Sequence, residues 1–159
     1  MTPSTLKALW YFFAFLAVVV LQTTFCHLIS VGGIEPDLIL IFVIFVSMKE
    51  GATAGVWTGF LAGLLFDVYS PQNLGCGSLA KALIGFSTGL LDERTLKIDD
   101  RLRLLIIFAA ALFHGLILHC VVFSLKSALT AAFLPHILPG ALYTTLVGGV
   151  VVFIDSRRD

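Results

Sequence analysis

Apolar segments of about the length needed to cross a lipid bilayer follow one another along almost the whole of this 159-residue sequence. The chain is 58% hydrophobic and only 13% charged, whereas ordinary soluble domains are about 25% charged. A transmembrane helix needs about 20 apolar residues, so about six of them would leave no room for a soluble domain. We therefore expect one all-α integral membrane domain over residues 1–159, with spans at 7–26, 37–48, 51–67, 76–91, 104–123 and 137–154.

The region 37–67 could form one long helix or two short ones. A single helix of about 30 residues would be about 45 Å long, against a hydrocarbon core of about 30 Å. The positive-inside rule favours two helices, because eight Lys and Arg residues then face the cytoplasm and only Lys126 faces outward. The sequence thus predicts a six-span bundle with both termini in the cytoplasm. Its short helices must be shielded by neighbours or lie in thinned bilayer.

Small residues recur at every fourth position in three of the spans. Such stripes let helices approach closely where lipid supplies no hydrophobic drive for association. Internal packing is the interpretation we favour, and a docking face for another membrane protein is the alternative. The stripes comprise Gly51, Gly55, Gly59 and Gly63; Gly77, Gly85 and Gly89 together with Lys81; and Gly140, Thr144 and Gly148.

Two ionisable residues lie where lipid penalises a charge: Asp67 at the end of one span, and Lys81 inside the next. Because a helical side chain leans toward the amino terminus of its helix, the sequence predicts an ion pair between Asp67 and Lys81. Snorkelling of Lys81 and an ion or proton path are the alternatives. His114 and His119 are about 140° apart around a helix, so we expect packing roles rather than a shared metal.

The composition also argues against several functional classes. Ten basic and ten acidic residues give a net charge of zero, without the basic patch of a nucleic-acid-binding protein. Cys26, Cys76 and Cys120 lack the spacing of a zinc site or a disulfide framework. No catalytic motif or paired carboxylate is present, so we expect no enzyme activity, cofactor or metal. The charged loop 92–103 predicts a solvated turn or a contact with a cytoplasmic partner.

Several motifs between residues 35 and 91 occur together. Pro36 and Asp37 precede an apolar run, a glycine-spaced helix ends in a GF-x-x-GLL-x-D pattern that includes Phe60 and Asp67, and a Leu-Gly pair at Gly75 precedes the next helix. This combination resembles the rod shape-determining protein MreD family of bacteria. In the rest of the chain the likeness rests on hydropathy, length and the six-span plan.

The resemblance implies a non-enzymatic component of the bacterial inner membrane that helps to insert peptidoglycan along the side wall and to maintain rod shape. It implies MreC, a single-span protein, as the most direct partner. The actin-like MreB and the glycan polymerase RodA, with its class B penicillin-binding transpeptidase, are implied as further members of the complex. The sequence leaves open whether the chain forms a homodimer and whether a lipid or wall precursor binds in the bundle.

The fold of that family is also similar to the substrate-binding subunits of energy-coupling-factor vitamin transporters. This similarity gives a second hypothesis, a small-molecule-binding subunit of a transporter. Two features of the sequence disfavour it. Ala8, Ala14 and Ala17 do not form the Ala-x-x-x-Ala docking motif of those subunits, and the outer loops offer few polar residues that could orient a vitamin.

Overall fold

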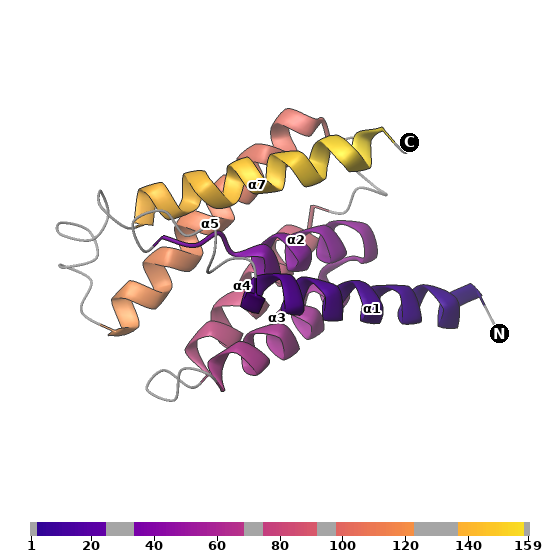
Figure 1. Ribbon diagram of the computed structural model, residues 1–159, viewed down its shortest axis with the longest axis horizontal. Coiled ribbons are helices and arrows are strands. Elements are labelled where there is room, and N and C mark those ends of the chain that lie inside the picture. The colour runs from indigo at the N-terminus through magenta and orange to yellow at the C-terminus, as the bar shows by residue number, and fades with distance from the viewer. Residues whose placement is uncertain (1–2, 25–33, 69–74, 92–97, 123–136, 158–159) are drawn as a thin grey trace.

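The computed structural model describes residues 3–24, 34–68, 75–91, 98–122 and 137–157, and over these ranges the protein is all-α. This confirms the all-α part of the predicted fold class. Residues 25, 26 and 123, at the ends of two predicted spans, lie outside the described ranges. The helices, shown in Figure 1, are α1 (Pro3–Thr24), α2 (Leu38–Glu50), α3 (Ala52–Asp67), α4 (Cys76–Gly89), α5 (Asp100–Val122) and α7 (Leu138–Ser156).

Two stretches of the described helices are long and apolar enough to cross a membrane, Asp100–Cys120 in α5 and Leu138–Ser156 in α7. The apolar stretches Leu9–Thr24 in α1 and Ala52–Asp67 in α3 are shorter. The structure therefore supports membrane insertion through α5 and α7, whereas six crossings remain a prediction.

Residues 37–67 form two helices, as the distribution of basic residues predicted. The helices meet at Gly51, whose φ of 91° lies in a region that side chains with a Cβ rarely adopt. The Gly51 N–H donates to the carbonyl oxygen of Ser47 at 2.8 Å and so closes the last turn of α2. A continuous helix through this point is thereby excluded.

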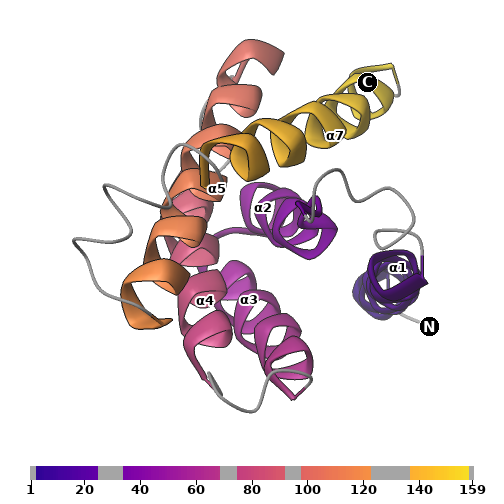
Figure 2. The same ribbon diagram turned by 60° about the vertical axis from the view of Figure 1, so that its left-hand side comes forward.

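α2 lies at the centre of the bundle, as the two views in Figures 1 and 2 show. α3 and α4 pack together on one side of it, α5 and α7 cross on the other, and α1 rests mainly on α2. The central helix therefore contacts every other described helix.

The sequence of α2 suits this central position because it is apolar around its whole circumference. Leu40 and Ile44 pack into a cluster with Ile107 of α5, and Ile39 and Val43 pack into a second cluster on the opposite side. With 13 residues, α2 is about 20 Å long, which is less than the hydrocarbon core of about 30 Å. Its neighbours shield it, which is one of the two solutions expected for a short span.

The glycine stripe of α3 lies against α4. A Cβ on Gly55 would collide with the carbonyl oxygen of Gly85, one on Gly59 with the backbone of Lys81, and one on Gly63 with the backbone of Ser78. The last stripe residue of α4, Gly89, approaches the start of α3 in the same way. The stripes of α3 and α4 therefore serve internal packing, and they are not available as a docking face.

Large apolar side chains cover the outside of the described helices. Trp10 of α1 and Trp57 of α3 are each 63% exposed, and Leu146 of α7 is 72% exposed. No large apolar side chain of α2 is exposed. Soluble monomers rarely expose such extensive apolar surface, so this distribution fits a bundle surrounded by lipid with α2 inside it.

The described helices alternate in direction, so α1 begins and α7 ends at the same side of the molecule (Figure 1). Polar contacts connect the helix ends on that side. Lys49 Nζ donates to Asp155 Oδ1 at 2.6 Å, and Arg103 lies 3.5 Å from Asp155 Oδ2. The end of α2, the start of α5 and the end of α7 are thus held together by charge.

Candidate functional site

A buried ion pair joins α2 to α4 on the side of the molecule opposite the termini. Lys81 Nζ lies 2.9 Å from Asp37 Oδ2; the Lys81 side chain is only 6% exposed and the Asp37 side chain 24%. The predicted partner of Lys81 was Asp67, so the structure corrects that prediction. The prediction chose Asp67 because it is close to Lys81 in the sequence. In the structure the start of α2, which is far from Lys81 along the chain, lies beside the first turns of α4.

The carboxylate of Asp67 is instead used by the backbone at the start of α4. Asp67 Oδ2 accepts the N–H groups of Gly75 and Ser78, each at 3.0 Å. These N–H groups have no partner within α4 and carry the positive end of its dipole. Gly75 has a φ of 94°, and a Cβ on Gly77 would strike the Asp67 carboxylate. The motif that joins Asp67 to Gly75 is therefore a helix cap.

His114 of α5 is the third member of the buried network. Its Nε2 lies 3.0 Å from Lys81 Nζ, and its Nδ1 lies 3.6 Å from Asp37 Oδ2. An ammonium group can only donate hydrogen bonds, so Nε2 must be the acceptor. The remaining ring proton then sits on Nδ1 and points toward Asp37. The described network combines one positive charge, one negative charge and a neutral imidazole.

Asp37 is held in place through its backbone and its side chain together. Its Oδ1 accepts the Leu40 N–H at 2.8 Å, which caps α2, and its own N–H donates to Thr144 Oγ1 of α7 at 3.2 Å. Gln22 of α1 braces the same segment, because it donates to the carbonyl oxygen of Pro36 at 3.0 Å and accepts from the Leu38 N–H at 2.8 Å.

Gln22 was missed by the sequence reasoning. The only signal was a long polar side chain, followed by Thr23 and Thr24, at the end of an apolar helix. Pro36 of the family motif is fully buried next to this brace. Phe60 of the same motif is 40% exposed on α3 and so lies on the outer surface of the bundle.

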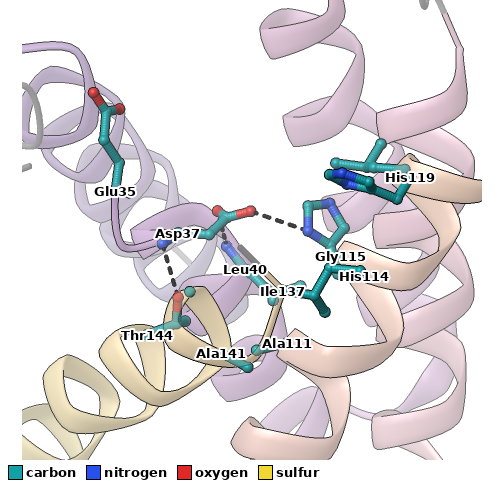
Figure 3. Close-up of a pocket in the computed structure, with 12 residues that line it drawn as sticks. Glu35, Asp37, Leu40, Ala111, His114, Gly115, His119, Ile137, Ala141 and Thr144 are labelled. Atoms are coloured by element: carbon teal, nitrogen blue, oxygen red, sulfur yellow. Dashed lines mark hydrogen bonds and ion pairs between the residues drawn. The ribbon is translucent and has the colours of Figure 1, made fainter. Parts of the chain in front are cut away.

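A cavity of about 240 Å³ opens next to this network, between the start of α2, α5 and α7 (Figure 3). Asp37, His114 and Thr144 form its polar wall, as their arrangement in Figure 3 shows, and Glu35 and His119 also line it. Most of the remaining wall is apolar and comprises Leu40, Ala111, Leu118, Ile137 and Ala141.

The chemistry of the site is that of a closed charge network beside a small cavity. Among the described residues no group of three or more His, Cys, Asp or Glu side chains could hold a metal ion. The Asp37 carboxylate is occupied by Lys81, and both nitrogens of His114 face groups of the same network. The arrangement can position helices and accept a polar group in the cavity.

A family model described as "rod shape-determining protein MreD" matches residues 3–155 of the chain, which confirms the resemblance inferred from residues 35–91. No curated protein and no solved structure gives a significant match. The likeness to transporter subunits therefore stays a prediction.

Proposed function

The chain belongs to the rod shape-determining protein MreD family, and from this premise we propose that it is a non-enzymatic scaffold of bacterial wall elongation. In this role it binds MreC in the cytoplasmic membrane and organises the peptidoglycan-synthesis proteins around it. Family membership itself fits a membrane protein with a role in rod-shape determination. The observation that carries the proposal is the match over nearly the whole chain, residues 3–155.

The proposed topology has six spans and both termini in the cytoplasm. It is supported by the basic residues, of which eight lie on the side assigned to the cytoplasm. The alternating helix directions and the common side of the first and last helices are compatible with it (Figure 1). The central burial of α2 also explains how a helix of 13 residues takes part in such a bundle.

The scaffold role is supported by how the chain uses its surface and its charges. The glycine stripes of α3 and α4 are taken up by the contact between these two helices. Partners must therefore meet other surfaces, such as the exposed apolar sides of α1, α3, α4, α5 and α7. In a membrane these sides are accessible to lipid and to the transmembrane helix of a single-span partner.

The direct test is replacement of the native copy in a rod-shaped host. Wild-type protein should restore rod shape and should co-purify with MreC from solubilised membranes. Gly59→Leu should fail in both assays, because its side chain cannot enter the α3–α4 contact. Gly140→Ala is the matched control, since its Cβ would meet only Ile34 at 3.7 Å, and it should behave as wild type.

Two results would count against the proposal. If cells remain rods after complete depletion of the protein, the proposed role in cell shape is contradicted. Cells that remain rods but then require an external vitamin would instead favour the transporter-subunit hypothesis, in which case an ATPase module should co-purify in place of wall-synthesis proteins.

A further inference from the structure

The cavity beside the buried network has room for more than water. Its volume of about 240 Å³ is several times the roughly 30 Å³ that one water occupies in the liquid. It is smaller than the roughly 300 to 1,000 Å³ of pockets for drug-sized ligands. An occupant must therefore be a small molecule or the head of a larger one.

The charges of the buried network at the cavity are already balanced. Glu35 also lines the cavity, but it is exposed, and Figure 3 shows its side chain directed away from Asp37 and His114. Asp37 and Lys81 cancel at 2.9 Å, and the hydrogen-bond geometry makes His114 neutral. A charged ligand would leave this buried network with an uncompensated charge, which is costly away from water. The network therefore favours an uncharged ligand.

The polar wall still offers an unused hydrogen-bond donor. Thr144 is 3% exposed and lines the cavity. Its oxygen accepts the Asp37 N–H, and among the described residues nothing accepts its hydroxyl proton. The neighbouring Asp37 carboxylate can accept a further bond, because each oxygen has two lone pairs. A group that accepts from Thr144 and donates to Asp37 satisfies both, and a hydroxyl does this.

We propose that this cavity binds a neutral, hydroxyl-bearing group of the polyol class, with its carbon atoms against Leu40, Ala111 and Ile137 and its hydroxyls on Asp37 and Thr144. Figure 3 shows these residues facing one space. The same chemistry is found in a free polyol and in the uncharged headgroup of a lipid. The inference goes beyond the scaffold role, because it assigns a ligand to the bundle.

The test measures the thermal stability of the full chain in an amine-oxide detergent, which carries no polyol. The probes are free glycerol, a monoacylglycerol, and the methyl ester of the same fatty acid as a control without hydroxyls. Binding should raise the apparent Tm saturably, by about 5 to 10 °C at a hundredfold excess over Kd. A shift with the monoacylglycerol alone identifies a lipid headgroup, and a shift with glycerol at low concentration identifies a free polyol.

Two variants separate binding from bulk stabilisation. Thr144→Val removes the hydroxyl with little change of shape, and Ala111→Leu places a larger apolar side chain at the cavity wall without removing any member of the network. Each should abolish the saturable shift, and Ala111→Leu keeps the test decisive if Thr144→Val does not fold. No saturable shift in the wild type, or an equal shift in the wild type and in Ala111→Leu, would overturn the proposal. A cavity filled with water alone gives the first of these results.

Discussion

The pairing of Asp37 with Lys81 predicts that Asp37→Asn strongly destabilises the protein. It also predicts that a second substitution at Lys81 restores much of the lost stability. Asp37→Asn removes the charge and keeps the cap of α2, because Asn and Asp are equally good at that position. Lys81, whose side chain is 6% exposed, then keeps its charge, and among the described residues its remaining side-chain partner is the His114 ring. Removing one partner of a buried ion pair costs about 3 to 5 kcal/mol.

That cost can be measured as a shift in thermal unfolding. For a chain of this size each kcal/mol lowers the apparent Tm by about 2 to 4 °C, so Asp37→Asn should lower it by about 6 to 20 °C. The double variant Asp37→Asn/Lys81→Met carries no unpaired charge, and it should recover at least half of the loss. The coupling between the two changes is obtained from a double-mutant cycle in one detergent.

The pair at the other side of the molecule provides the control. Lys49 and Asp155 lie 2.6 Å apart, and the Lys49 side chain is 36% exposed, against 6% for Lys81. A partly exposed pair is worth about 0 to 1 kcal/mol, and Asp155 keeps Arg103 as a partner when Lys49 is replaced. Lys49→Met should therefore lower the apparent Tm by no more than about 4 °C. Equal shifts in the two single variants, or a double variant as unstable as Asp37→Asn, would refute the reasoning from burial.

Three further predictions follow from the packing, the cap and the proposed topology. Gly59→Ala should destabilise by about 1 to 3 kcal/mol, since its Cβ would strike the Lys81 backbone, and Gly140→Ala should be neutral in the same thermal assay; neutrality of both would show that the helices separate easily. Asp67→Ala should cost about 0.5 to 2 kcal/mol through loss of the α4 cap, with faster amide exchange confined to the first turn of α4, and protection equal to wild type there would contradict the capping role. Reporter fusions after Asp99 and at the carboxyl terminus should both read cytoplasmic and one after Ser70 periplasmic, whereas opposite readings at the first two would exclude six spans.

Much of the fold could be predicted from the sequence because each helix has a recognisable local pattern of apolar, basic or small residues. The apolar runs indicated the helix positions, and the basic residues favoured two helices within 37–67, whose junction the structure places at Gly51. The glycine spacing indicated close packing, and the structure identifies the partner as α4. These features depend on residues that are neighbours in sequence or on one helix.

The candidate site could not be predicted in the same way, because it combines four helices. Asp37, Lys81, His114 and Thr144 were each singled out, yet nothing in their spacing shows that they meet. The prediction for Asp67 failed for a related reason. A carboxylate near a helix start can bind backbone N–H groups as well as a cation, and a count of charged side chains overlooks the backbone.

The central position of α2 has a consequence for how the protein is made. The translocon releases helices into lipid in the order of synthesis, but α2 is short and has no large apolar side chain left exposed in the finished bundle. Of the described helices that pack against it, all but α1 are synthesised after it, including α5 with Ile107 and α7 with Val152. In the proposed six-span topology, α2 must therefore wait at the translocon or beside α1 until the later helices arrive. Chains truncated before α5 should accordingly leave α2 accessible to quality-control proteases, although their own α3–α4 contact is complete.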